Sequence, residues 1–347
     1  MNHVFHYLVL EMPGHYKAWI DIKTKIMKYK FPLLIILLAQ FLTNCSPNKK
    51  KSDTLDQNVA VLEYKINAKL GEGAFWDHQN HKLYWVDIEG KILHIYDPVK
   101  RSNISFPTPS RIGTVVPMLD NEAIIALEDG IYKINTLSGE IELLSDVESR
   151  MSENRFNDGK CDPNGNLWVG SMHLEQSAPK ANLYRISKDG EATKMLDSIT
   201  ISNGIVWSSD QKTMYYIDTP TGNILAYDFD MNNSTISNER VAVEVPETLG
   251  YPDGMAIDEE DMLWVGMWNG NSVARFNPQT GKLVSKIEVP AHNVTSCAFG
   301  GENLDILYIT TASIDMTDEE KEKFPLAGSI FKADPGVKGV KSNFFGN

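Results

Sequence analysis

The chain has 347 residues and carries 33 Lys and Arg against 46 Asp and Glu, which gives it a formal net charge of −13 at pH 7. An acidic chain without basic clusters does not attract phosphate backbones, so the charge balance argues against nucleic-acid binding. Long helical periodicity is absent and the turns are rich in Gly, Asn and Asp, which argues against an all-helical fold.

The N-terminal region has the layout of a secretory signal. A basic stretch at 27–30 precedes an apolar run at 31–42, which is too short to span a membrane comfortably. Cys45 closes this run, as a lipidated cysteine does in bacterial lipoproteins. An ordinary signal peptide with an incidental cysteine is the alternative.

These features predict the division of the chain. We expect residues 1–26 to be an upstream misannotation, 27–45 a lipoprotein-type signal peptide, and 46–58 a flexible, lysine-rich tether. Residues 59–347 form the folded domain. The protein is then exported, as a periplasmic or outer-membrane lipoprotein of a bacterium, and meets the membrane only through a lipid on Cys45.

The rest of the chain repeats one layout: a polar residue and usually a glycine, an apolar run, a turn, and a second apolar strand. Six copies begin near Gly71, Ile112, Asn157, Ser202, Tyr251 and Ser296. The second half of each copy alternates apolar and polar residues, which is typical of a half-buried outer strand. A repeat of roughly 40–50 residues with several short strands is typical of a propeller blade. We therefore predict an all-β fold, a six-bladed β-propeller.

One position of the repeat is unusually polar. The residue before the glycine, or before the cysteine that replaces it in the last copy, is in turn Glu72, Ile112, Asp158, Asn203, Asp253 and Ser296. Equivalent positions of successive blades form a ring, so we expect three carboxylates and a carboxamide at one mouth of the channel. Such a set predicts a divalent metal there, with oxygen ligands that suit Ca²⁺ or Mg²⁺, allow Mn²⁺ and favour Zn²⁺ less. The alternative is that Asn-Gly and Asp-Gly are ordinary turn dipeptides.

Three further polar residues are candidates for the same mouth. Arg155 and Asn157 come just before the ring residue of the third copy and could hydrogen-bond a polyhydroxy or carbonyl ligand. Glu175 follows the next strand in a loop. The alternatives are that Arg155 is a surface cation and Glu175 an ordinary loop acid. No Gly-x-Ser-x-Gly elbow, phosphate loop or dinucleotide fingerprint occurs, which disfavours serine-hydrolase and nucleotide chemistry.

Two cysteines, Cys161 and Cys297, fall within the repeats. They belong to the third and sixth copies, which lie on opposite sides of a six-fold ring. We therefore expect no disulfide between them and interpret both as small buried apolar residues.

Several motifs together resemble one known family. These are Leu-Gly-Glu-Gly-Ala-Phe-Trp at 70–76, Arg-Phe-Asn-Asp-Gly-Lys at 155–160, Ile-Ser-Asn-Gly-Ile-Val-Trp at 201–207, Pro-Asp-Gly-Met at 252–255 and Thr-Ser-Cys-Ala-Phe-Gly-Gly at 295–301. They are similar to motifs of the regucalcin (senescence marker protein)/gluconolactonase family, and the similarity runs from about residue 62 to the C-terminus. The resemblance implies a six-bladed propeller that binds one divalent cation, often Ca²⁺, and hydrolyses sugar lactones.

The resemblance also implies residue roles. Glu72, Asn203 and Asp253 correspond to the metal ligands, and Asp253 also to the general base. The substrate-binding residues correspond to Arg155, Asn157 and Glu175. Asp158 lies near the ion as an outer-sphere neighbour rather than as a clear ligand.

We therefore expect a monomeric, metal-dependent hydrolase that opens sugar lactones. Ca²⁺ is the expected ion, with Zn²⁺, Mn²⁺ or Mg²⁺ open, and it polarises the lactone carbonyl for attack by water. Two alternatives stay open. The same metal site could hydrolyse organophosphate or aryl esters, or the propeller could bind a ligand or calcium without catalysis.

Overall fold

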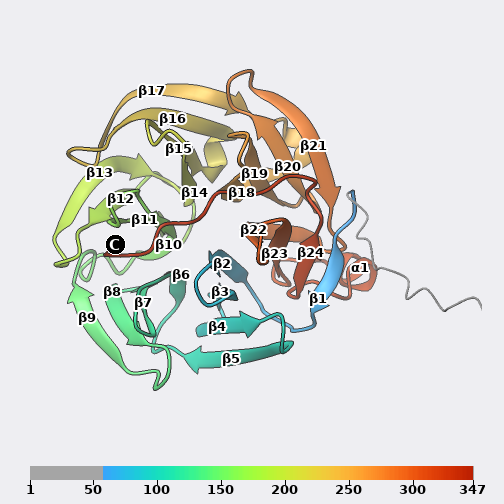
Figure 1. The fold of residues 1–347 in the computed structure, drawn as a ribbon, viewed down its shortest axis with the longest axis horizontal. Coiled ribbons are helices and arrows are strands. Elements are labelled where there is room, and N and C mark those ends of the chain that lie inside the picture. The colour runs from blue at the N-terminus through green and yellow to red at the C-terminus, as the bar shows by residue number, and fades with distance from the viewer. Residues whose placement is uncertain (1–57, 347) are drawn as a thin grey trace, which may run out of the picture. The chain divides into compact units, whose positions relative to one another are not determined.

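The computed structural model of the chain describes residues 58–346. Within them, six four-stranded antiparallel sheets surround a common axis, and Figure 1 looks down that axis. The predicted six-bladed all-β propeller is confirmed. The predicted upstream segment, signal peptide and lipidation site Cys45 lie outside the described residues, as does the tether up to residue 57.

Each blade runs from an inner strand at the axis to an outer strand at the rim. The inner strands are β2 (Gly71–Asp77), β6 (Ile112–Pro117), β10 (Asn154–Cys161), β14 (Ser202–Trp207), β18 (Tyr251–Ile257) and β22 (Asn293–Gly300). The second strands are β3 (Lys82–Asp87), β7 (Glu122–Leu127), β11 (Leu167–His173), β15 (Thr213–Asp218), β19 (Leu263–Trp268) and β23 (Ile306–Ala312). The third strands are β4 (Ile92–Asp97), β8 (Gly130–Asn135), β12 (Ala181–Ile186), β16 (Asn223–Asp230), β20 (Ser272–Asn277) and β24 (Ile330–Ala333). The outer strands are β5 (Ser102–Pro107), β9 (Ile141–Ser145), β13 (Ala192–Ile199), β17 (Thr235–Glu244), β21 (Lys282–Glu288) and β1 (Val61–Tyr64).

The last blade takes its outer strand from the start of the domain. β1 pairs antiparallel with β24, so that Val61 lies opposite Lys332 and Leu62 opposite Phe331. Beside this pairing, Lys332 Nζ lies 2.8 Å from a carboxylate oxygen of Glu63. The first and last strands of the domain therefore share one sheet, and this sheet closes the ring.

Helices are few in the described part of the chain. The α-helix α1 (Asp318–Lys323) lies between β23 and β24 and begins with a capping box formed by Thr317 and Glu320. Of two 3₁₀ turns, η1 (Thr219–Thr221) lies between β15 and β16 of one blade, and η2 (Glu247–Leu249) lies in the connection from β17 to β18 of the next blade. Between residues 58 and 346, no helix is long and apolar enough to cross a membrane.

The segment after β24, residues 334–346, crosses the channel at the ends of the inner strands. Figure 1 shows it passing over several blades to end near β10. Along this path Gly339 bridges Asp258 and Asn343 bridges Cys161, and the amide of Phe345 donates to the carbonyl of Pro117 at 3.1 Å. This C-terminal segment therefore covers one mouth of the channel.

Aspartates at the ends of inner strands hold the turns that follow. Asp258 is fully buried, and its carboxylate accepts hydrogen bonds from the Trp264 indole and Arg275 Nε, both at 2.8 Å. Asp162 is equally buried and accepts from the Trp168 indole at 2.9 Å, without an arginine partner. The two aspartates thus have the same role, but Asp258 also pairs with a mostly buried cation, Arg275.

Asp258→Ala is expected to lower the free energy of unfolding by about 3 kcal/mol, because it removes the buried counter-charge of Arg275 and leaves that cation only the exposed Glu260. Asp162→Ala is the matched control and should cost only about 1–3 kcal/mol, since it removes hydrogen bonds and no ion pair. Chemical denaturation of both variants measures the difference. Equal losses in the two variants would contradict a special role for the ion pair.

Candidate active site at the open mouth of the channel

Every inner strand contains an irregularity at the polar position of the repeat. The pairing with the second strand shifts between Glu72 and Phe75, Ile112 and Thr114, Phe156 and Gly159, Ser202 and Ile205, Pro252 and Met255, and Val294 and Cys297. A bulge of this kind frees one or two residues from the ladder and changes the direction of their side chains. Because the bulge recurs at the same position of every inner strand, it explains how the equivalent side chains of successive blades reach the same place.

The glycines after the ring residues are needed for close packing. A Cβ on Gly204 would lie 2.8 Å from the carbonyl oxygen of Asp253, and one on Gly254 would lie 2.5 Å from Ser296 Oγ. Both glycines thus press against the next blade. Asn203–Gly204 and Asp253–Gly254 lie inside β14 and β18, so the alternative that they are turn dipeptides is wrong.

Glu72, Asn203 and Asp253 come together at the wall of one cavity of about 320 Å³. All three side chains are buried. Burial, and then the charge of Asp158, raises the pKa of Glu72 to about 7. Burial and the charge of Glu72 raise the pKa of Asp253 as well. The two carboxyl groups therefore resist full ionisation unless a positive charge is added.

Asp158 lies beside this pair but not in the cavity wall. Its Oδ1 accepts from the amide of Gly159 at 2.8 Å, whereas its Oδ2 is buried without a hydrogen-bond partner. A carboxylate oxygen without a partner beside two crowded acids suits a hard cation nearby. Within residues 58–346, no set of three or more His, Cys, Asp or Glu side chains is arranged to hold a metal. The predicted metal site is not a set of this kind, because one of its three ligands is the amide oxygen of Asn203.

A chain of hydrogen bonds connects the polar residues of three blades. Arg155 Nη1 donates to Asn157 Oδ1 at 2.6 Å, and Asn157 Nδ2 donates to Asn203 Oδ1 at 3.2 Å. Asn203 Nδ2 then donates to Thr219 Oγ1, which donates to the carbonyl of Pro252, both at 2.8 Å. Arginine can only donate and a carbonyl can only accept, so every amide in the chain has one possible orientation. Asn203 therefore presents its oxygen, rather than its NH₂ group, beside Asn157.

Arg155 is a buried cation of this mouth and not a surface residue, as one alternative held. The residue is 7% exposed and lines the cavity. Burial lowers its pKa to about 10, although Glu89 and Glu72 act in the opposite direction. It stays charged at neutral pH and offsets part of the negative charge of the acids.

The remaining wall of the cavity is largely apolar. It is formed by Leu70, Ile88, Met172, Ile201, Tyr251, Trp268 and Ile314, with Gln176, Asn269 and Asp315 among the polar residues. Glu175 is exposed and does not line the cavity, whereas its neighbour Gln176 does. The structure thus brings together all the predicted site residues except Glu175, with Asp158 just behind the wall.

Thr219 is the functional candidate that the sequence does not reveal. It follows the second strand of its blade, in η1, outside every repeated motif. Only its two hydrogen bonds show that it holds Asn203 against the backbone next to Asp253.

Comparison with known proteins shows which family the chain belongs to. A sequence model of the SMP-30/Gluconolactonase/LRE-like region matches residues 70–313, which include all the residues of the predicted site. The chain belongs to the SMP-30/gluconolactonase family. The resemblance inferred from the motifs is confirmed.

Members of the SMP-30/gluconolactonase family resemble the chain over nearly their whole length. The Bacillus subtilis protein named "Putative sugar lactone lactonase YvrE" is 40% identical over 79% of this chain and 94% of its own. Regucalcin of Xenopus laevis is 34% identical over 80% of this chain and 95% of its own. The crystal structure of a calcium-binding protein, regucalcin, from Agrobacterium tumefaciens superposes with a TM-score of 0.79 at 25% identity, over 83% of this chain and 97% of that one.

Thr219→Val removes the hydroxyl from the hydrogen-bond chain. We expect the free energy of unfolding to fall by about 1–2 kcal/mol, because the Asn203 amide and the Pro252 carbonyl both lose a partner. Thr219→Ser, which keeps the hydroxyl, is the control and should lose clearly less. Denaturant unfolding of the two variants measures this, and a valine variant as stable as the serine variant would contradict the role of the hydroxyl.

Proposed function

We propose that this protein hydrolyses sugar lactones. The observation that carries the proposal is the buried Glu72–Asp253 pair beside Asn203, in the wall of a cavity large enough for a small ligand. The lactonase name of the Bacillus subtilis relative supports the choice of substrate class.

A divalent cation is part of the proposal, with Glu72, Asn203 and Asp253 as the residues that would hold it. Their oxygen atoms suit Ca²⁺ best, and the Agrobacterium tumefaciens relative is described as a calcium-binding protein. Such an ion would supply Lewis-acid polarisation of the lactone carbonyl.

The reaction itself needs a proton acceptor, and Asp253 is the carboxylate best placed for it. Its carboxylate is buried in the cavity wall beside Glu72, in the space that would hold the lactone and the attacking water. Asp253 takes a proton from water as the water oxygen bonds to the carbonyl carbon. The ester C–O bond of the ring then breaks, and its oxygen receives the proton, which yields the open hydroxy acid.

The hydrogen-bond chain and the apolar wall of the cavity would orient the substrate. The hydrogen bonds that Arg155 makes within the described residues all come from Nη1, which leaves Nε and Nη2 for ring hydroxyls or the carbonyl. Trp268 and Tyr251 provide aromatic surface for the C–H face of a sugar. Gln176 is better placed than Glu175 to reach a bound ring, because it lines the cavity.

Hydrolysis of glucono-1,5-lactone by the full-length protein tests the function. Activity should disappear after treatment with EDTA and return with Ca²⁺ or another divalent ion. Asp253→Asn should reduce kcat by about 10²–10⁴-fold, the typical contribution of a general base. Glu175→Gln is a control with the same chemical change outside the cavity and should keep most of the activity.

Two results would overturn the lactonase proposal. Turnover of aryl or phosphotriester substrates without lactone turnover would move the function to those esters. Calcium binding without turnover of any ester would leave a binding propeller.

The raised pKa of Glu72 predicts opposite effects of pH on the two forms of the protein. Without metal, the folded state binds more protons than the unfolded state between the ordinary pKa of 4.5 and about 7. Its free energy of unfolding therefore falls as the pH rises through this window. Ca²⁺ must displace these protons, so its affinity should rise over the same window.

Thermal unfolding in EDTA and in excess Ca²⁺, from about pH 5 to about pH 8, measures this linkage. The difference in Tm between the two conditions should widen as the pH rises through this window. Glu72→Gln should remove most of the widening. A Tm difference that does not depend on pH would contradict cation binding by this carboxylate.

A further inference from the structure

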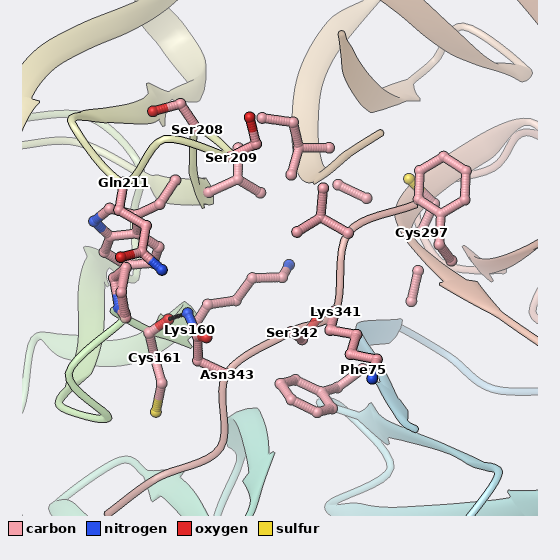
Figure 2. Close-up of a pocket in the computed structure, with 18 residues that line it drawn as sticks. Phe75, Lys160, Cys161, Ser208, Ser209, Gln211, Cys297, Lys341, Ser342 and Asn343 are labelled. Atoms are coloured by element: carbon pink, nitrogen blue, oxygen red, sulfur yellow. Dashed lines mark hydrogen bonds between the residues drawn. The ribbon is translucent and has the colours of Figure 1, made fainter. Parts of the chain in front are cut away.

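The other end of the channel holds a second cavity, beneath the C-terminal segment. Its volume is about 140 Å³, and it is lined by the far ends of the inner strands and by residues 340–343. Figure 2 shows the Lys160 side chain extending into the middle of this space, with Lys341 on the C-terminal segment nearby. We call this space the lysine cavity.

The charges of the lysine cavity are all of one sign. Lys160 and Lys341 are the charged residues among its lining, which contains no Asp or Glu. The carboxylates nearby lie outside the lining and are engaged: Asp210 with the Ser208 hydroxyl at 2.7 Å, and Asp261 with the Ser209 hydroxyl at 2.8 Å. Asp162 accepts from the Trp168 indole, and Asp158 from the amide of Gly159. A cavity lined by two lysines is unexpected in a chain whose net charge is −13.

Lys160 is a buried cation with donors to spare. The residue is 9% exposed, and its Nζ donates to the carbonyl of Met255 at 2.9 Å. No carboxylate of the described residues lies within ion-pair distance of Nζ. An ammonium has three N–H donors, and burying it without a counter-charge is costly. The two donors not used by Met255 therefore favour an anion.

The neighbouring side chains supply no counter-charge to Lys160. Trp207 lines the cavity, is 7% exposed, and its indole N–H has no hydrogen-bond partner among the described residues. Cys297 and Cys161 also line it, as two free and buried thiols. Burial raises the pKa of Cys297 to about 12, so it stays neutral and cannot act as the counter-ion of Lys160.

We propose that the lysine cavity binds a small oxyanion, held by Lys160 and Lys341 and enclosed by the C-terminal segment. The cavity is much smaller than the roughly 300–1,000 Å³ of pockets for drug-sized ligands, so it suits a ligand of a few non-hydrogen atoms. A short carboxylate and an inorganic oxyanion such as phosphate share the required chemistry. Both accept several charge-assisted hydrogen bonds from ammonium groups.

Thermal unfolding of the full-length protein tests the proposal. The protein is titrated with sodium acetate or sodium phosphate at constant ionic strength, against chloride as reference and without added calcium or lactone. A ligand that binds only the folded state raises Tm in a saturable way. We expect such a rise with at least one of the two anions, and the stronger one identifies the source as a carboxylate or an inorganic oxyanion.

Lys160→Met should weaken the binding about tenfold or more, because it removes the buried donor. Lys282→Met removes the same charge from the exposed face of β21 and should leave the binding unchanged. Lys341 is exposed. Lys341→Met should weaken anion binding several-fold, and it is the decisive variant if Lys160→Met does not fold.

Two results would overturn the proposal. One is a wild-type Tm that responds to acetate and phosphate only as it does to chloride. The other is a saturable rise that the folded lysine variants share in full, because salt exclusion acts equally on all of them. Neither result depends on the proposed lactonase activity, since the test uses no lactone.

Discussion

The close approach of six inner strands around one axis is the constraint on which the rest of the structure depends. At this distance a side chain in place of Gly204 or Gly254 would strike the neighbouring blade. The same crowding coincides with a bulge in every inner strand, which turns the polar residues out of the ladder. The ring closes because β1 pairs with β24 in the last sheet. This pairing at the rim joins the start of the domain to its last blade.

Crowding at the axis gives the channel two ends of opposite charge. At the open mouth, Glu72 and Asp253 lie together beside Asp158, and burial raises the pKa of both carboxyl groups. Arg155 supplies part of the balancing charge there. Lys160 belongs to the same inner strand as Asp158 but turns to the covered end, where the backbone of Met255 accepts its hydrogen bond. A single strand thus contributes an acid to one end and a base to the other.

The repeat explains which parts of the site could be predicted from the sequence. Glu72, Asn203 and Asp253 occupy one phase of the repeat, and a ring must bring equal phases together. Glu175 lies in a loop, where the repeat no longer determines direction, and a positive φ at Gln176 turns that residue to the cavity instead. Thr219 was not predictable, because its importance comes from two hydrogen bonds to other parts of the site.

The sequence by itself determined the all-β class, the number of blades and the phase of the polar ring, because each of these is a local or periodic property. Only the tertiary structure decided that β1 closes the last blade, that Thr219 orients Asn203, and that the C-terminal segment covers the far mouth. The contact of Asn343 with Cys161 joins residues 182 positions apart. No repeat or local propensity specifies such a contact, since it forms only after the blades have packed around the axis.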